Sequence, residues 1–214
     1  MRAIFLDRDG VICENRPDHV KSWDEFRFLP GALAGLAQLS GSEFAKVVVT
    51  NQAVINRGMV SASALNDIHA RMLAEVERAG GCIDRVMLCP HRPDENCVCR
   101  KPKPGMIFQA AAEMGIDLSR SYLIGDTTTD VQAGLTAGLT CFMVLTGLGL
   151  KQSALAMSRT EVSFRFARDL QHAVEMILYL EAFGGGRRAP FHAARTPASL
   201  ARPPAMTALA VSRL

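Results

Sequence analysis

Residues 3–10 read AIFLDRDG, a short apolar run that ends in two aspartates separated by an arginine. Apolar runs of this length, bounded by polar residues, are typical of strands buried in a sheet. Side chains two residues apart on a strand point to the same side, so Asp7 and Asp9 can face one edge of the sheet together. In open α/β sheets, ligands bind at the carboxyl ends of the strands. The stretch therefore predicts a strand that presents two carboxylates at a ligand site.

Four further runs of the same kind follow at residues 46–50, 85–88, 121–125 and 140–145. Helical patterns lie between most of them. Residues 61–79 place apolar side chains at three- and four-residue steps and close at two glycines, and a second helix is expected between Pro104 and Gly115. Strands that alternate with helices indicate an α/β fold with a doubly wound parallel sheet.

The pattern changes at the C-terminal end of the chain. Residues 167–183 carry one more helical pattern, whereas residues 184–214 are rich in Gly, Ala, Pro and Arg and hold few large apolar side chains. Such a composition cannot bury enough apolar surface to offset the entropy of ordering. We therefore expect one folded domain at residues 1–183 and a disordered tail at residues 184–214.

Composition and charge narrow the classes of function. The 214 residues are 49% hydrophobic and 21% charged, which is ordinary for a globular protein. The formal net charge is +3, but five arginines lie in residues 184–214, which leaves about −2 for residues 1–183. This charge gives no support to a nucleic-acid partner, and no apolar run is long enough to predict a signal peptide or a membrane span. A cytoplasmic monomer that acts on a small molecule is expected.

The second and fourth runs also end in polar residues. Residues 50–52 read TNQ, and a hydroxyl and a backbone amide at a strand end can hold a phosphoryl oxygen, although Thr-Asn after a strand is often turn chemistry alone. The fourth run ends in Gly125 and Asp126, and Asp126 with Asp7 offers the oxygen ligands that Mg²⁺ takes. Asp130 follows at the start of a helix, where it is expected to cap the helix, to brace the site, or to do both.

A basic segment precedes the helix that is expected after Pro104. It contains Arg100, Lys101 and Lys103. A lysine ammonium can offset the charge on the oxygens of a phosphate, and either lysine can take this role. A solvated basic loop is the alternative interpretation.

One loop carries a complete set of zinc ligands. Three cysteines and one histidine lie within eleven residues of the chain, namely Cys89, His91, Cys97 and Cys99. Three thiolates and one imidazole saturate a tetrahedral Zn²⁺ ion, so the site is expected to be structural and not catalytic. A chance cluster of buried thiols is the alternative.

In chain order, these motifs resemble the four motifs of the haloacid dehalogenase superfamily. The resemblance implies a magnesium-dependent phosphatase with a doubly wound sheet, a zinc-stapled loop and no large cap domain. It also implies the roles of the site residues: Asp7 as covalent nucleophile, Asp9 as general acid and base, Thr50 and Lys101 as phosphate holders, Asp7, the Asp9 carbonyl and Asp126 as Mg²⁺ ligands, and Asp130 as support.

Four segments narrow the resemblance to one subgroup. Residues 7–11, 50–52, 89–91 and 97–102 are similar to the subgroup that contains the heptose 1,7-bisphosphate and histidinol-phosphate phosphatases. This resemblance implies removal of the 7-phosphate of D-glycero-D-manno-heptose 1,7-bisphosphate, in lipopolysaccharide precursor biosynthesis, with substrate contacts from Asn51, Gln52, Arg57 and Arg100. Thr127 departs from the subgroup, where a basic residue is frequent at this position.

Three alternatives remain open. Histidinol phosphate is an amine, and Glu14 and Asp18 can supply an acidic pocket for it. A DNA 3′-phosphatase shares the motifs, but the slightly acidic body and the lack of an aromatic run argue against it. A non-catalytic zinc-binding module has no need of the five intact residues Asp7, Asp9, Thr50, Lys101 and Asp126.

Overall fold

The computed structural model describes residues 1–157, 164–183 and 209–211. Within these residues, seven strands form one sheet in the order β6-β5-β4-β1-β2-β3-β7. Six of them are parallel, and the short strand β7 pairs antiparallel with β3 at one edge. The bounds of the strands are β1 Arg2–Leu6, β2 Phe44–Asn51, β3 Arg85–Cys89, β4 Tyr122–Gly125, β5 Thr140–Val144, β6 Phe164–Ala167 and β7 Leu209–Val211.

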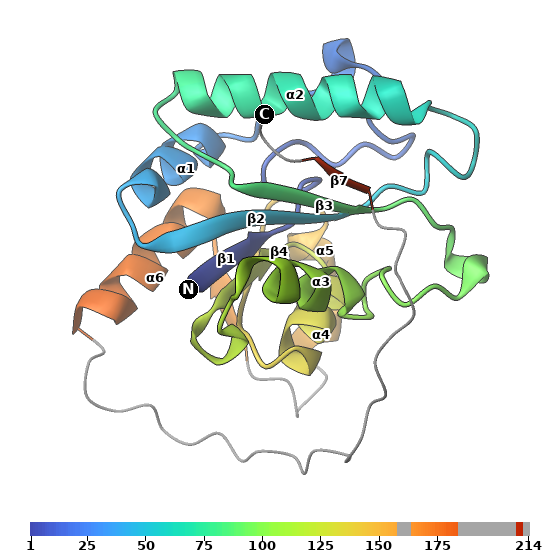
Figure 1. The fold of residues 1–214 in the computed structure, drawn as a ribbon. Coiled ribbons are helices and arrows are strands. Elements are labelled where there is room, and N and C mark those ends of the chain that lie inside the picture. Colours follow the sequence, from blue (N-terminus) through green and yellow to red (C-terminus); the bar gives the residue numbers. More distant parts are fainter. Residues whose placement is uncertain (158–163, 184–208, 212–214) are drawn as a thin grey trace.

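Helices cover both faces of this sheet (Figure 1). Residues of α1, α2 and α6 share one hydrophobic cluster with the sheet, and residues of α3 and α4 share the other. The bounds of the helices are α1 Ala32–Ser40, α2 Ala62–Arg78, α3 Gly105–Met114, α4 Thr128–Thr136, α5 Gly149–Met157 and α6 Leu170–Phe183, with 3₁₀ turns η1 Trp23–Glu25, η2 Pro93–Glu95 and η3 Leu118–Arg120. The predicted doubly wound parallel sheet is therefore confirmed.

Strand β1 lies in the middle of the sheet and is buried on both faces. Ile4 and Leu6 pack into the cluster under α1, α2 and α6, whereas Ala3 and Phe5 pack into the cluster under α3 and α4. A parallel strand covered on both faces reads as a continuous apolar run, which explains why residues 3–6 show no polar alternation. The end of β1 therefore opens at the centre of the carboxyl edge.

Several elements differ from the expected pattern. The strand β6 and the helices α1 and α5 are not predicted by the sequence. In β6 only Ala167 is fully buried, because this strand lies at the edge of the sheet, so its apolar signal is weak. Within the described ranges, no segment forms a separate cap domain over the carboxyl edge of the sheet.

The predicted tail at residues 184–214 lies mostly outside the described residues. Of this segment the structure describes only β7, whose backbone pairs Val211 with Val86 and Leu209 with Leu88. The boundary at residue 183 and the disorder of the tail stay predictions. In the part of the chain that is described, no helix combines the length and the apolar character that crossing a bilayer requires.

Candidate active site

The carboxyl ends of β1, β2 and β4 lie next to one another, because β1 pairs in parallel with both of the other strands. Leu6, the last residue of β1, is in register with Val48 of β2 and with Ile124 of β4. The next residue continues the pairing, since the Asp7 N–H donates to the Ile124 carbonyl at 3.0 Å. This register brings together the aspartates that follow β1 and β4.

Asp7, Asp126 and Asp130 form an acidic cluster in which one carboxylate oxygen from each residue lies within 4.8 Å of the others. Asp126 is fully buried, and its Oδ2 accepts a hydrogen bond from the Leu148 N–H at 2.8 Å. Its other oxygen, Oδ1, has no hydrogen-bond partner among the described residues. A buried carboxylate oxygen without a donor is costly unless a cation satisfies it. The cluster therefore has the oxygen donors that a hard divalent cation requires.

Two glycines give Asp126 the room that this position requires. A Cβ atom at Gly10 would lie 2.0 Å from Asp126 Oδ2, and one at Gly147 would lie 2.3 Å from the same atom. Both glycines also have left-handed backbones, with φ of 88° and 57°. Other residues rarely adopt such φ values. A larger residue at either position would displace the carboxylate.

Lys101 is the cation that contacts the acidic cluster. The side chain is buried, and its Nζ lies 2.9 Å from Asp7 Oδ1 and 2.6 Å from Asp130 Oδ1. The side-chain amide of Asn51 fixes the Lys101 peptide group, because it accepts from the Lys101 N–H at 3.1 Å and donates to the Lys101 carbonyl at 3.2 Å. The strand end of β2 therefore holds the backbone from which the lysine reaches Asp7.

The other predicted cations lie outside this cluster. The Lys103 Nζ is exposed and donates to two carbonyls of the cysteine-containing loop, at 2.9 and 3.1 Å. Arg100 donates to a third carbonyl of that loop at 3.0 Å. Arg57 contacts the imidazole of His19 at 3.1 Å on the surface. Of the two lysines that the sequence left open, the fold brings Lys101 to Asp7.

Asp9 has a different set of partners. Arg8 donates to both of its oxygens, from Nη2 to Oδ1 at 2.9 Å and from Nε to Oδ2 at 3.2 Å. Gln52 Nε2 donates to Asp9 Oδ2 and to Thr50 Oγ1, both at 2.8 Å. The Cys13 thiol lies 3.6 Å from Oδ1. The Asp9 carboxylate is therefore held by fixed donors, and Gln52 joins it to Thr50.

Burial and neighbouring charges shift the pKa values of these aspartates in opposite directions. Burial raises the pKa of Asp7 to about 7, and the adjacent carboxylates add to the rise. Burial and the charge of Asp7 likewise raise the pKa of Asp126 to about 8. For Asp9, burial also acts to raise the pKa, but the charge and hydrogen bonds of Arg8 outweigh it and lower the pKa below its ordinary value.

Asp130 supports the site in two ways. Thr127 is the N-cap residue of α4, and Asp130 at the third helical position completes a capping box with it. The Asp130 Oδ2 accepts the Thr127 N–H at 3.0 Å, while its Oδ1 faces Lys101. Asp130 is therefore not the N-cap residue itself. It stabilises the helix start and contacts the buried lysine.

The four predicted zinc ligands lie together at the end of β3. The Sγ atoms of Cys89 and Cys99 are 3.2 Å apart, and the Cys97 Sγ lies 3.6 and 3.5 Å from them. The His91 Nδ1 lies 3.2 Å from the Cys99 Sγ. The four donor atoms thus surround one point, as a tetrahedral ion requires.

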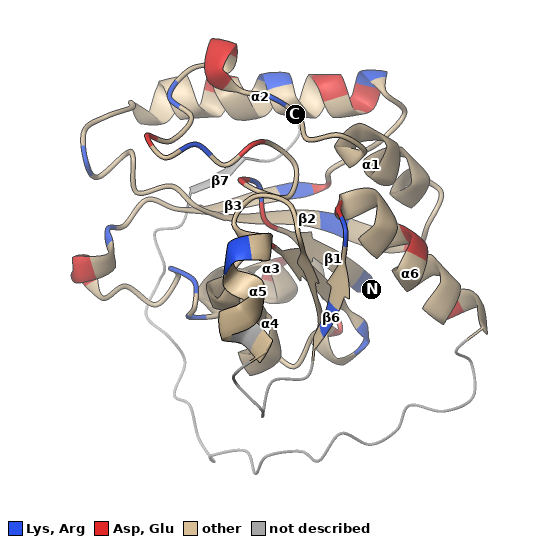
Figure 2. Ribbon diagram, turned by 180° about the vertical axis from the view of Figure 1, so that it is seen from behind, with Lys and Arg blue, Asp and Glu red and all other residues tan. Residues whose placement is uncertain are grey.

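A cleft of about 340 Å³ lies between the cysteine-containing loop, Asn51 at the end of β2 and Thr129 of α4, and Lys101 borders it. Basic side chains dominate its polar lining, since Arg92, Arg100, Lys101 and Lys103 all border it, together with Asn51 and Thr129. Figure 2 shows this loop projecting at the edge of the fold, with blue segments on either side of the red turn η2. The cleft is therefore suited to a negatively charged ligand.

Two further residues in contact with this site are not predicted by the sequence motifs. The side chain of Arg8 is buried between Asp9 and His69 of α2, with 3.0 Å between its Nη1 and the His69 Nε2. An arginine between two aspartates directly after a buried strand is the signal that could have indicated such a contact. Nothing in the local sequence indicates the partner 61 residues away.

Known proteins share both the sequence and the fold. A family model described as HAD-hydrolase-like matches residues 98–173. A D-glycero-beta-D-manno-heptose-1,7-bisphosphate 7-phosphatase of Bordetella bronchiseptica is 38% identical over 178 residues, which cover 83% of this chain and 98% of that protein. The enzyme of the same name from Neisseria meningitidis serogroup A is 41% identical over 151 residues, which cover 71% of this chain and 81% of that protein.

Solved structures of similar phosphatases have the same fold as this chain. The D,D-heptose 1,7-bisphosphate phosphatase of B. bronchiseptica, crystallised with magnesium and phosphate, superposes with a TM-score of 0.79 at 38% identity, over 84% of this chain and 99% of that chain. The corresponding phosphatase of Burkholderia thailandensis gives a TM-score of 0.64 at 30% identity, over 83% of this chain and 99% of that chain. The chain therefore belongs to the HAD-like hydrolase family, in the group of the D-glycero-D-manno-heptose 1,7-bisphosphate phosphatases.

Proposed function

We propose that this protein is a magnesium-dependent phosphatase that removes the 7-phosphate of D-glycero-D-manno-heptose 1,7-bisphosphate. The observation that carries the proposal is the contact of the buried Lys101 ammonium with the carboxylate of Asp7, beside the Asp126 oxygen that has no donor among the described residues. One nucleophile, one phosphate-holding cation and one cation site meet there, at an open sheet edge. Relatives with at least 37% identity carry this activity in their names.

In the first half-reaction, an oxygen of Asp7 attacks the phosphorus of the substrate. The bond between phosphorus and the sugar oxygen breaks, and Asp9 donates a proton to that oxygen as it leaves. Lys101 and Thr50 hold the phosphoryl oxygens and offset their charge. The products of this step are the dephosphorylated sugar position and an acyl phosphate on Asp7.

In the second half-reaction, Asp9 takes a proton from a water molecule, whose oxygen attacks the phosphorus of the acyl phosphate. The bond between phosphorus and the Asp7 oxygen breaks, which releases inorganic phosphate and restores the free carboxylate. Asp9 regains the proton that it gave up in the first half-reaction. The two aspartates therefore complete the cycle without another proton donor.

The acidic cluster fits a Mg²⁺ ion. Asp7, the backbone carbonyl of Asp9 and Asp126 would hold it, and the unpartnered Oδ1 of Asp126 supports this assignment. When bound, the ion neutralises part of the charge that the phosphate and the carboxylates bring together. The magnesium in the related B. bronchiseptica structure is consistent with this choice of cation.

The cysteine-containing loop fits a Zn²⁺ ion held by Cys89, His91, Cys97 and Cys99. The donor set leaves no open position, so the ion would fix the loop and take no part in the chemistry. The loop continues directly into Arg100 and Lys101. A fixed loop would therefore place these two cations on the cleft.

The cleft favours a bisphosphate over histidinol phosphate. Its basic lining suits the second phosphate of the sugar, whereas the amine of histidinol phosphate requires carboxylates. Asp18 does not supply one freely, because it is already paired with Lys21 and Arg16. Arg100 and Lys103 are the cations of the cleft that would meet the second phosphate.

A comparison of substrates tests the proposal. With Mg²⁺, the purified protein should release phosphate from the heptose bisphosphate with a kcat/KM at least roughly 100-fold higher than from histidinol phosphate, because an unmatched charge is strongly rejected. EDTA should abolish the release. Equal or inverted kcat/KM values for the two substrates would contradict the assigned substrate, and activity in EDTA would contradict the assigned cation.

A further inference from the structure

Arg8 is the largest side chain that the fold buries completely, with 1% exposure. It lies between Asp7 and Asp9 in the chain, and its guanidinium reaches His69 of α2. A buried guanidinium is tolerated only when most of its donors have partners. Here Nε and Nη2 donate to Asp9 as a two-pronged fork, and Nη1 contacts His69.

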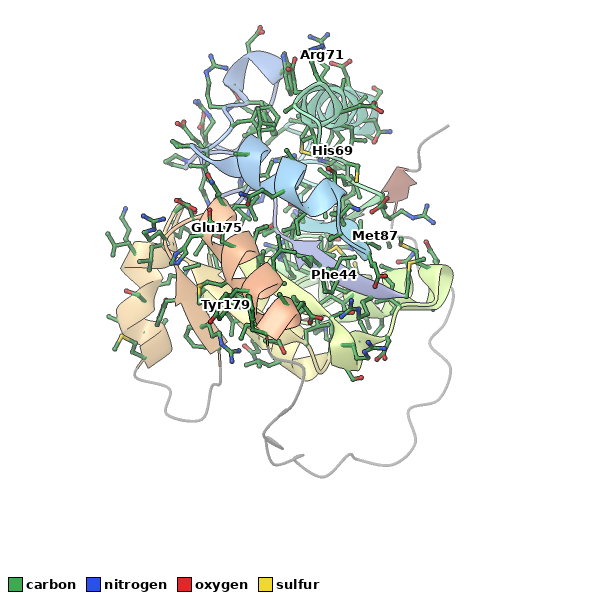
Figure 3. The ribbon with its side chains drawn as sticks, turned by 90° about the vertical axis from the view of Figure 1, so that its left-hand side faces the viewer. Phe44, His69, Arg71, Met87, Glu175 and Tyr179 are labelled. Carbon is green, nitrogen blue, oxygen red and sulfur yellow. The ribbon has the colours of Figure 1, made fainter. Side chains whose placement is uncertain are left out.

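His69 lies on the buried side of α2. Figure 3 shows it on the side of this helix that faces the sheet, with Arg71 on the outward side. His69 is fully buried, on the same face as Leu65 and Met72. A histidine on this face is usually core filling, but an apolar side chain would fill the same volume without the cost of burying an imidazole.

The contact with Arg8 defines the state of this imidazole. A guanidinium has only donors, so the His69 Nε2 must accept, and the ring is neutral with its proton on Nδ1. Burial and the charge of Arg8 lower the pKa of His69 to about 3, which agrees with a neutral ring. The Nδ1 has no hydrogen-bond partner among the described residues, so the single polar contact of the ring is the one with Arg8.

We propose that Arg8 and His69 are positioning residues for the general acid and base Asp9. The neutral His69 fixes the guanidinium of Arg8 from the α2 side, and the Arg8 fork fixes the orientation of the Asp9 carboxylate. The side-chain contacts of both residues are with Asp9 and with each other, and only the Arg8 backbone N–H donates to Asp7, at 2.7 Å. This inference rests on the proposed function, because it assigns a role within the same phosphatase reaction.

The proposal predicts which chemical step becomes slower when the contact between Arg8 and His69 is lost. A misplaced Asp9 protonates a leaving alkoxide poorly, but the nitrophenolate of p-nitrophenyl phosphate leaves without a proton. The parameter kcat/KM covers the reaction up to the departure of this group. Loss of the Arg8–His69 contact should therefore lower kcat/KM for the sugar phosphate far more than for p-nitrophenyl phosphate.

Five proteins make the experiment decisive: wild type, His69→Leu, His69→Gln, Arg8→Lys and Met72→Ala. His69→Leu removes the Nε2 acceptor for Arg8. Arg8→Lys keeps the positive charge but loses the paired hydrogen bonds to Asp9. Either variant can test the contact if the other folds poorly. His69→Gln keeps an acceptor oxygen near the former Nε2. Met72→Ala is the matched control, because it weakens the same buried face of α2 without touching Arg8.

We expect kcat/KM to fall more for the sugar phosphate than for p-nitrophenyl phosphate. His69→Leu and Arg8→Lys should each lower the ratio of the two kcat/KM values by roughly tenfold or more, within the 10²- to 10⁴-fold that acid–base catalysis supplies. His69→Gln should recover most of the ratio, and Met72→Ala should leave it unchanged. Equal losses for both substrates in His69→Leu and Arg8→Lys would overturn the inference.

Asp9→Asn separates this inference from the proposed function. If wild type hydrolyses both substrates and the kcat/KM of Asp9→Asn falls mainly for the sugar phosphate, the acid–base role of Asp9 is supported. An unchanged ratio in His69→Leu and Arg8→Lys would then refute the positioning role alone. If wild type hydrolyses neither substrate, the proposed function fails, and the inference fails with it.

Discussion

Asp7 and Asp9 are two residues apart, yet their charged neighbours differ: Asp7 lies among other carboxylates that share the cation of Lys101, whereas Asp9 is paired with Arg8. Asp7 lies with Asp126 and Asp130 around one point, and burial raises the pKa values of Asp7 and Asp126 to about 7 and 8. Asp9 instead receives the Arg8 fork, which lowers its pKa. The three carboxylates of the first arrangement share a single ammonium, that of Lys101, so a further cation is needed to balance them when all are ionised. The charge of Asp9 is already balanced by Arg8.

This difference leads to a prediction for the two aspartates. Asp7→Asn should lower kcat by at least roughly 1000-fold, because an amide is neither a nucleophile nor a good Mg²⁺ ligand. Asp9→Asn should lower kcat by roughly 100-fold or more through the missing proton transfer. Steady-state phosphate release measures both, with circular dichroism as the control for folding. Near-wild-type turnover of Asp7→Asn would contradict the covalent mechanism.

The two lysines before α3 form a matched pair for a second prediction. Lys101→Met should lower kcat/KM by roughly 100-fold or more, because the methyl group cannot offset the charge of the transferred phosphoryl group. Lys103→Met should change kcat/KM less than roughly tenfold, and through KM, since this ammonium contacts only loop carbonyls at the cleft. If Lys103→Met has the larger effect on kcat, the assignment of the phosphate-holding lysine is wrong.

At the scale of elements, the loop between β3 and α3 connects the cluster of Cys89, His91, Cys97 and Cys99 to Lys101, the proposed phosphate-holding lysine. The four candidate ligand atoms lie within 4.8 Å of one another at one end of this loop, and Asn51 holds the backbone of Lys101 at the other end. Cys97→Ser or Cys99→Ser should release Zn²⁺ and raise KM at least as much as it lowers kcat, because the loop places the cations of the cleft.

Metal analysis and kinetics together check this prediction. Protein purified without added metal should contain about one zinc per chain, and the serine variants should contain less. Cys82→Ser is the matched control, since Cys82 lies outside the cluster. If the reduced wild-type protein contains no zinc, the assignment of Zn²⁺ to this loop is wrong. Full activity in both serine variants would show that the ion plays no part in placing the cations of the cleft.

At the scale of the whole molecule, the raised pKa values of Asp7 and Asp126 predict how stability depends on pH. The folded protein without Mg²⁺ holds protons that the unfolded chain releases near pH 4. The stabilisation from these protons is therefore complete below about pH 4 and is lost as the pH rises through about 7 and 8. Mg²⁺ favours the ionised forms, so it should raise the melting temperature more at pH 8 than at pH 6.

Thermal melts with EDTA and with Mg²⁺ at both pH values measure this effect. Asp126→Asn is the control, because it removes one of the two titrating carboxylates and one ligand of the ion. Its melting temperature should respond little to Mg²⁺ at either pH. A Mg²⁺-induced shift in wild type that is larger at pH 6 would contradict the arrangement of the acidic cluster.

The sequence predicts most of the elements that carry the site, and it misses elements where the local signal is weak. The helix α2 shows a clear apolar stripe, and its observed bounds Ala62–Arg78 lie within one residue of the expected range. The strand β6 reads FRFA and has one fully buried residue, so it lacks the uninterrupted apolar run that marks the central strands β1 and β4. The candidate reactive groups are easier to recognise in the sequence than the ends of the weaker elements, because a carboxylate or thiol at a strand end is visible without its surroundings.

What the sequence alone determines is the set of reactive groups and their order along the chain. The pair Asp7 and Asp9 at one strand end, and the four donors of the cysteine-containing loop, follow from local spacing, because residues this close in the chain cannot lie far apart. The strand order, which places β4 beside β1 and so brings Asp126 to Asp7, depends on hydrogen bonds between distant segments. The choice of Lys101 over Lys103, and the contact of Arg8 with His69, depend on the same long-range packing. Only the tertiary structure decides them, because the direction of a side chain is set by the backbone that the rest of the fold holds in place.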